Sequence, residues 1–433
     1  MGERPHPPAE PADQGKPSAK LTVRRMAPWR KTLYAIFAAQ MLAIVGFSLR
    51  APFLPFYLQD LGDLSTDDAA IWSGLINAGG AGVMALTAPI WGVVADRYGR
   101  RPMVLRAMFA SACTLGLMAF ATAPWHLLAL RFVEGAFSGT VTASTALVAA
   151  SSPKERLGFS MGLVQTAVFS GASLGPLFGG ILADQIGYQA TFAVASAMLA
   201  GGGLIVLLLV QERFTPQPRG PERGFGAVWA ATSWLLGPLM ITMIGVLVVV
   251  RFASSAVQPI IPLYVEQIAH ATAGNASTVA GLTLGILGLT SAVSAIYFGR
   301  LGDRIGHRRI LLACALGAGL LYLPMAIVQS TWQLIVLQGL FGVAAGGLIP
   351  TANALVGAST PPERRGALFG MTASAAALGG FFGPIAGGAI AATFGFPTAF
   401  VTVAVLLLAM TVVVWRVFAR HRRSEDVATG AAG

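Results

Sequence analysis

Long apolar blocks, separated by short stretches that carry almost all of the charge, constrain what this chain can fold into. Only 11% of its 433 residues are charged and 55% are hydrophobic, whereas a typical soluble domain has about 25% charged residues. So few charges cannot coat the surface of a soluble protein of this length. The composition excludes a soluble enzyme, a disordered chain and a disulfide scaffold, and it indicates a polytopic membrane protein.

Twelve of the blocks are long enough to cross a bilayer as helices, because a span needs about 20 mostly apolar residues. The blocks are apolar nearly all round and contain Gly and Ala throughout, as membrane helices do. Lipid-spanning strands would alternate apolar with polar residues. The predicted spans cover residues 33–58, 71–95, 103–122, 125–150, 158–183, 189–210, 234–264, 275–299, 310–328, 332–357, 366–392 and 396–415.

The distribution of Lys and Arg predicts the orientation of these spans through the positive-inside rule. With both termini in the cytoplasm, 26 of the 29 basic residues fall in the tails and inner loops, where Arg106 at the start of the third span is counted with the loop before it, and none falls in an outer loop. The other three, Arg50, Arg131 and Arg251, lie inside spans. The net charge of +11 is spaced between apolar blocks, so it indicates membrane topology and not a nucleic-acid partner.

The two halves of the chain resemble each other at an offset of 207 residues, which becomes 208 after a one-residue slip. Pro52, Pro55 and Tyr57 match Pro259, Pro262 and Tyr264 at the first offset, and Trp125 matches Trp332. Each half holds six spans, so the halves are parallel repeats. The predicted organisation is a disordered cytoplasmic tail (1–32), a six-helix bundle (33–210), a cytoplasmic linker (211–233), a second bundle (234–418) and a basic cytoplasmic tail (419–433).

A charged loop follows the second span, and a weaker copy follows the eighth. Gly99 suits a tight turn with positive φ, and Asp96 at the membrane edge can face a helix N-terminus or an Arg. A contact that forms only when the bundles close at the cytoplasm would bias a two-state equilibrium; the alternative is an anchor with a structural ion pair. The predicted gating loop comprises Gly92, Asp96, Arg97, Gly99, Arg100 and Arg101, with Asp303 and Arg304 in the copy.

This loop resembles the signature of the major facilitator superfamily, and other motifs extend the resemblance over about residues 33–418. Arg131-x-x-Glu134-Gly135 is similar to that superfamily's Arg-x-x-Gln-Gly motif, with Glu in place of Gln. Pro52-x-x-Pro55-x-Tyr57 and Trp72-Ser73-Gly74 are similar to bacterial drug:proton antiporters with twelve spans. The resemblance implies a major facilitator fold in which spans 1, 4, 7 and 10 line a central cavity.

The fifth span resembles the motif associated with antiporters of this superfamily. Pro176 removes a backbone donor and kinks the helix, and the glycines let a neighbouring helix approach closely. A kinked, tightly packed span could seal one side against ion leak, but span 11 carries the same pattern, which ordinary helix packing also explains. The motif residues are Gly171, Gly175, Pro176, Gly179 and Gly180.

Charged residues inside spans are costly, and they are candidates for function. Glu134 is the one carboxylate placed deep in a span, and Arg131 lies three residues earlier on the same helical face. These two residues are the predicted proton-coupling pair, with a permanent structural ion pair as the alternative. The predicted cavity residues are Arg50, Arg251, Gln40, Gln165, Gln258, Gln338 and Asn353, although each amide alone also suits a helix–helix hydrogen bond.

Arg50 and Arg251 then remain as unpaired positive charge, if Glu134 pairs with Arg131. An anionic group on a substrate could supply the missing partner. Phe47, Phe252, Phe381 and Phe382 would hold its apolar body. In the alternative, Arg50 extends to the outer headgroups, and Arg251 bonds to backbone carbonyls.

The sequence holds no nucleotide-binding loop GxxxxGK[ST] and no cluster of metal ligands, no GxSxG stretch suggests catalysis, and the two cysteines lie in apolar stretches. We therefore expect no enzyme activity, cofactor or metal, and an ion gradient as the driving force. The leading interpretation is a multi-pass protein of the bacterial cytoplasmic membrane, monomeric, that exports diverse amphiphilic drugs in exchange for protons. The alternatives are an uptake symporter or facilitator for a small metabolite, and a membrane sensor or assembly partner that transports nothing.

Overall fold

A computed structural model gives the fold, and it describes residue 2 and residues 28–212, 238–269, 275–358 and 365–430. Every element in these residues is helical, which confirms the predicted all-α class. The first tail and most of the linker lie outside the described residues. The last span extends further than predicted, because its helix continues to Gly430.

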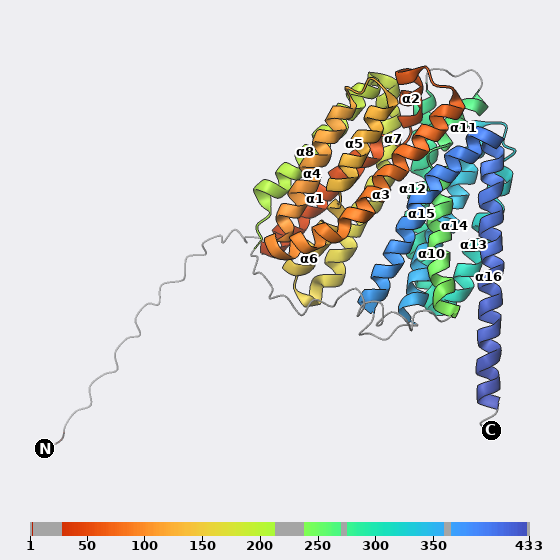
Figure 1. Ribbon diagram of the computed structural model, residues 1–433. Helices are drawn as coiled ribbons and strands as arrows, with labels where there is room; N and C mark the ends of the chain where they lie inside the picture. Colours follow the sequence, from red (N-terminus) through yellow and green to blue (C-terminus); the bar gives the residue numbers. More distant parts are fainter. Residues whose placement is uncertain (1, 3–27, 213–237, 270–274, 359–364, 431–433) are drawn as a thin grey trace.

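The helices form two bundles (Figure 1). The first contains α1 (Pro28–Leu49), α2 (Leu54–Gly62), α3 (Thr66–Tyr98), α4 (Arg100–Met118), α5 (Pro124–Phe137), α6 (Thr140–Ser151), α7 (Leu157–Ile186) and α8 (Tyr188–Leu209), with a 3₁₀ turn at Lys154–Arg156. The second contains α10 (Pro238–Val257), α11 (Ile261–Ala269), α12 (Ala276–Ile305), α13 (His307–Met325), α14 (Thr331–Ala358), α15 (Arg365–Phe394) and α16 (Phe396–Gly430).

Each predicted block coincides with one helix or with a pair of consecutive helices. Within the described residues, nine helices are long and apolar enough to cross a membrane, or up to ten if α10 and α11, bent by 41°, make one span. The other two blocks differ for physical reasons: α4 carries Arg100, Arg101 and Arg106, and α5 and α6 are short helices of 14 and 12 residues.

The duplication read from the sequence recurs in the packing. The hydroxyl of Tyr57 donates to the carbonyl of Met118 (3.2 Å), and 207 residues later the hydroxyl of Tyr264 donates to the carbonyl of Met325 (2.8 Å). Each tyrosine ring also contacts a phenylalanine, Phe192 and Phe400 respectively. Both bundles are therefore built on one plan.

The first span of each repeat is broken at its proline. Pro52 lies in the turn between α1 and α2, and Pro259 lies between α10 and α11. A proline lacks the N–H that continues a helix, so the chain bends there. The break places Arg50 in one repeat and Gln258 in the other at the end of the first helix segment.

The bundles meet through two helix pairs, α7 with α12 and α3 with α15. Close backbone approach allows this packing: Gly180 and Gly281 lie against α12 and α7 backbone, and Gly74 and Gly388 lie against α15 and α3 backbone. The short helices α2 and α11 lie at the same end of the molecule (Figure 1).

Contact between the bundles stops halfway along these helices. On α3, Gly82 touches Phe381 of α15. Further along the same face, at spacings of three and four residues, Leu86, Ile90 and Val93 are exposed. On α12, Val293 and Ile296 are likewise exposed beyond the contacts of Gly281, Gly285 and Gly288 with α7. The bundles diverge from there toward the end at which α16 leaves the molecule (Figure 1).

Candidate functional site

Three charged side chains form a cluster in the N-terminal bundle. Arg50 Nη1 donates a hydrogen bond to Glu134 Oε1 (3.2 Å), and Arg131 Nη1 forms an ion pair with Glu134 Oε2 (2.9 Å). The Glu134 side chain is only 3% exposed. Two guanidinium groups against one carboxylate give the cluster a formal charge of one positive.

The expectation that Arg50 lacks a partner is wrong, because Glu134 pairs with both arginines. Arg50 directly follows α1 at the proline break, and its side chain reaches α5 across 84 residues of sequence. The expected pair of Arg131 and Glu134 is present, three residues apart on α5.

Two glycines make room for the cluster. A Cβ at Gly80 would lie 2.8 Å from Cζ of Arg131, and one at Gly135 would collide with the carbonyl of Gly80. The absence of side chains at both positions lets α3 and α5 approach closely and leaves a slot for the guanidinium. Gly135 of the Arg-x-x-Glu-Gly motif therefore allows the close helix approach that holds the side chain of Arg131 in place.

A break between α5 and α6 lies five residues after Glu134, at Gly139. Gly139 has a φ of 116°, and it separates α5 from α6. The break frees backbone carbonyls, which need other donors. Trp91 Nε1 donates to the carbonyl of Ala136 (2.6 Å), and Arg106 Nη2 donates to the carbonyl of Ser138 (3.1 Å).

The local sequence indicates no structural role for Arg106. It lies within α4, with its guanidinium 3.5 Å from the centre of the Trp91 ring. The pair of Trp91 and Arg106 thus supports the broken span that carries Glu134. Comparison of the repeats contains a signal for this role, since Phe298 and Ala313 take their places in the second half.

A polar cavity of about 210 Å³ lies where α3, α10 and α15 come together. Arg251 and Gln258, both predicted cavity residues, are exposed there. The lining residues are Asn77, Ala81, Arg251, Ser254, Ser255, Gln258, Pro259, Gly380 and Pro384. This cavity adjoins both bundles, because α3 belongs to the first and α10 and α15 to the second.

The other amides predicted for the cavity lie elsewhere. Gln40 is buried inside the N-terminal bundle, where it donates to Thr140 (3.5 Å) and accepts from Ser144 (3.0 Å). Gln338 is buried on α14, Gln165 is exposed on α7, and Asn353 is half-buried on α14. The structure therefore brings together Arg251 and Gln258 but not these four residues.

The two copies of the charged loop share a backbone conformation. Gly99 and Gly306 have φ values of 97° and 96°, as the tight turn requires. Asp303 pairs with His307 of its own loop (3.2 Å), while the side chain of Asp96 lies outside the described part of the structure. The gating role of the loop stays a prediction.

Glu212 is a residue of this loop region that the sequence did not reveal. Its carboxylate accepts from the backbone N–H groups of Arg100 (3.0 Å) and Arg101 (2.7 Å). A carboxylate at a helix N-terminus satisfies free N–H groups and meets the positive end of the helix dipole. Glu212 therefore ties the end of the first bundle to the start of α4.

The glycines of the fifth span pack against two helices. Gly171, Gly175 and Gly179 face α1, where a Cβ would collide with Ile44, Ser48 and the backbone of Leu49. Gly180 faces α12 instead, at the backbone of Ser277. The motif thus joins α7 both to its own bundle and to the opposite one.

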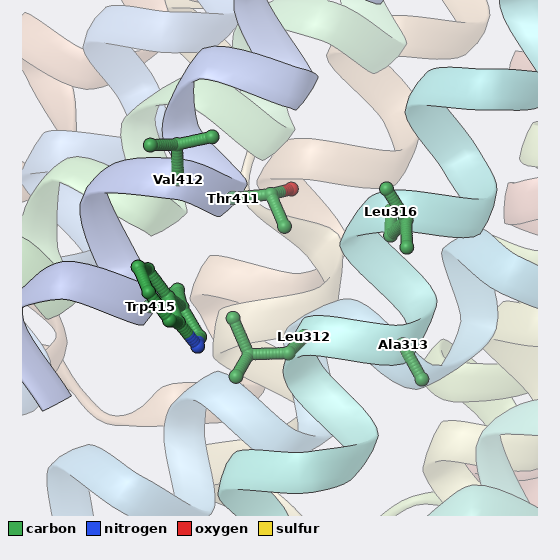
Figure 2. Close-up of a pocket in the computed structure, with 6 residues that line it drawn as sticks. All are labelled: Leu312, Ala313, Leu316, Thr411, Val412 and Trp415. Carbon is green, nitrogen blue, oxygen red and sulfur yellow. The ribbon is translucent and has the colours of Figure 1, made fainter. Parts of the chain in front are cut away.

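A second hollow, of about 310 Å³, lies between α13 and α16. Figure 2 shows its lining, which is Leu312, Ala313, Leu316, Thr411, Val412 and Trp415. Five of these six side chains are apolar, and neither helix is among those that join the bundles. The hollow has no charged group that could carry chemistry.

Two repeated helical bundles, joined through glycine-lined helix pairs around a polar cavity, define an integral membrane transporter. Comparison with known families agrees: the Major Facilitator Superfamily profile matches residues 36–273 and 243–433. The chain belongs to the Major Facilitator Superfamily, and it is not an enzyme.

Two relatives of this chain are named for drug resistance. The chain is 34% identical over 405 residues to the multidrug resistance protein MdtG of Serratia proteamaculans, covering 93% of this chain and 98% of that protein. It is 33% identical over 402 residues to the multi-drug resistance efflux pump PmrA homolog of Lactococcus lactis, covering 92% and 98%.

Solved structures share the fold at lower identity. The human organic anion transporter MFSD10 (TETRAN) has a TM-score of 0.66 at 21% identity, covering 90% of this chain and 100% of its own. The nucleoside transporter NupG has a TM-score of 0.74 at 12% identity, covering 89% and 99%. At these identities the likeness extends to the fold alone.

Proposed function

We propose that the chain is a proton-coupled exporter of diverse amphiphilic drugs, with twelve spans and both termini in the cytoplasm of a bacterium. The observation that carries this proposal is the cluster of Arg50, Arg131 and Glu134. A carboxylate held inside a membrane domain is costly unless it works, and this one sits beside a break in each of two spans. The names of the relatives favour export over uptake.

The charge balance of the cluster suggests how a proton is exchanged. Protonation of Glu134 would leave two buried guanidinium groups without a counter-charge, which is unfavourable. Proton binding therefore requires that Arg50 withdraw from Glu134. Arg50 lies in the turn between α1 and α2, two residues before Pro52, so a change in the bend at this turn moves Arg50 without unfolding either helix.

The arrangement of the bundles supports alternating access. Asp184 of α7 accepts from the backbone N–H of Thr278 on α12 (2.7 Å), and Gln59 on α2 donates to Glu266 on α11 (3.4 Å). With the termini inside, these contacts hold the outer end together while the inner end is apart. Export requires these contacts to break and the inner ends to meet.

The test is transport into proteoliposomes with an imposed pH gradient, using a panel of fluorescent amphiphiles. We expect Glu134→Gln to abolish gradient-driven accumulation and its dependence on pH, because the variant cannot gain or lose the proton. Glu155→Gln is the matched control, since Glu155 is exposed in the turn before α7. Unchanged pH dependence in Glu134→Gln would remove Glu134 from the coupling step.

A further inference from the structure

Arg251 carries a positive charge that no described side chain balances. None of the three ion pairs among the described residues includes Arg251, and no hydrogen bond from its guanidinium to a described residue is present. The sequence offers two alternatives, in which Arg50 extends to the headgroups and Arg251 bonds to backbone carbonyls. The structure shows neither, because Arg50 pairs with Glu134 and Arg251 does not bond to the described backbone carbonyls. A charge within a membrane domain needs a partner.

The guanidinium opens onto the polar cavity between the bundles. Arg251, Ser254, Ser255 and Gln258 follow one another at helical spacing along one side of α10. Across from them, α15 supplies Gly380, where a Cβ would stand 3.9 Å from Nε of Arg251. Gly380 has no side chain, so the guanidinium lies beside bare backbone at the lining of the cavity.

Among the described residues that line the cavity, the one charged group is a hydrogen-bond donor, the guanidinium of Arg251. The hydroxyls of Ser254 and Ser255 donate to carbonyls of their own helix, at Val250 (3.0 Å) and Arg251 (2.7 Å). Asn77 donates one N–H to the carbonyl of Ser73 (2.9 Å). The remaining strong donors are the guanidinium of Arg251 and the amide of Gln258, which is exposed at the break between α10 and α11.

The size of the cavity limits what it can hold. Sites for whole drug-sized molecules measure about 300–1,000 Å³, and this cavity measures about 210 Å³. It therefore suits an ionic head group whose apolar body lies outside it. Phe382 on α15 is exposed near the cavity residue Gly380, and Phe381 packs on Gly82 of α3.

We propose that Arg251, assisted by Gln258, binds the anionic group of the transported amphiphile, a carboxylate, phosphonate or sulfonate. This inference rests on the proposed function, and it names the substrate class of that function. A guanidinium binds such oxyanions through two parallel hydrogen bonds. The bound anion would neutralise Arg251 in a cavity lined by helices of both bundles. Its binding energy would therefore depend on how the two bundles are placed relative to each other.

Direct binding to the purified full-length protein in detergent tests the inference. Fluorescein serves as the anionic probe and ethidium as the permanent cation, each followed by fluorescence anisotropy at fixed ionic strength. We expect Arg251→Gln to weaken fluorescein binding at least about tenfold and to leave ethidium binding unchanged or stronger. Arg309→Gln, which removes an equal charge at an exposed position of α13, keeps wild-type binding of both probes.

Two further variants keep the test decisive if Arg251→Gln does not fold. Arg251→Lys retains the charge but loses the fork, and Gln258→Leu loses the second donor; each should weaken fluorescein binding severalfold. Equal fluorescein binding in both variants and the wild type overturns the inference, as does a wild type that binds ethidium but not fluorescein. Intact fluorescein binding without gradient-driven transport contradicts the proposed function and leaves this inference standing.

Discussion

The two bundles share a backbone plan and differ at their centres. In the first, Arg50, Arg131 and Glu134 form a buried charged cluster. At an offset of 207 the second has Val257, Gln338 and Phe341, all buried. The ring of Phe341 contacts that of Tyr322, with 4.5 Å between the ring centres.

The same difference extends to the neighbours of each centre. Gly80 leaves room for Arg131, whereas Leu287 fills the corresponding place on α12. The helices α5 and α6 are separated at Gly139, whereas α14 runs unbroken through Gly346. The second repeat therefore has an uncharged centre beside the unbroken helix α14, while the first has a charged centre beside the break between α5 and α6.

The largest effect is expected from converting one centre into the other. Glu134→Ala leaves two buried guanidinium groups unpaired, which should lower the free energy of unfolding by about 3–5 kcal/mol. Replacing the set Gly80→Leu, Arg50→Val, Arg131→Gln and Glu134→Phe should restore stability but not transport. Chemical unfolding in mixed micelles measures the first quantity and proteoliposome flux the second.

Gln338→Leu is the control from the other half. The Oε1 atom of Gln338 has no hydrogen-bond partner among the described residues, so its removal should leave the unfolding free energy unchanged or raise it. If the quadruple variant still transported substrate against a gradient, the charged cluster of the first bundle would not be needed for coupled transport.

The two charged loops offer the next comparison. Asp96→Asn should lower transport about tenfold, equal to about 1.4 kcal/mol of lost closure at the cytoplasmic end, while the protein still inserts. Asp303→Asn should be milder, because Asp303 pairs with His307 in its own loop. The measurement is transport flux in proteoliposomes of equal protein content. Near-wild-type transport in both variants would contradict a gating role for the charged loops.

The broken span gives a smaller expected effect. Arg106→Ala removes the donor to the carbonyl of Ser138 and should cost about 1–3 kcal/mol of unfolding free energy, the penalty of an unsatisfied buried group. The corresponding residue of the second half is already Ala313, beside an unbroken helix, and Ala313→Ser should change little. Equal losses from the two substitutions would show that the break at Gly139 does not need Arg106.

The smallest effect tests the symmetry itself. Tyr57→Phe and Tyr264→Phe each remove hydroxyl hydrogen bonds to a carbonyl in the third span of their repeat. Each should cost about 0.5–1.5 kcal/mol, and the two losses should agree within experimental error. A loss of unfolding free energy in only one of the two variants would mean that the equivalent hydrogen bonds do not stabilise the two bundles equally.

Sequence reasoning located the helices and the repeat because both depend on local composition and on spacing within the chain. It paired Arg131 with Glu134 because they are three residues apart on one helix. It missed the contact of Arg50 with Glu134, which depends on how α1 and α5 are rotated toward each other across 84 residues. Glu212 was missed for a similar reason, since its carboxylate reaches the start of α4 only after the bundle has assembled.

The separation of Arg50 from Glu134 along the chain has a consequence for how the protein is made. Translation proceeds at about 5–20 residues per second, so the 84 residues between these partners take about 4–17 s to synthesise. Throughout that interval Arg50 is already made and its carboxylate is not. During that interval the guanidinium of Arg50, at the end of the first helix, needs water or a lipid headgroup as its partner.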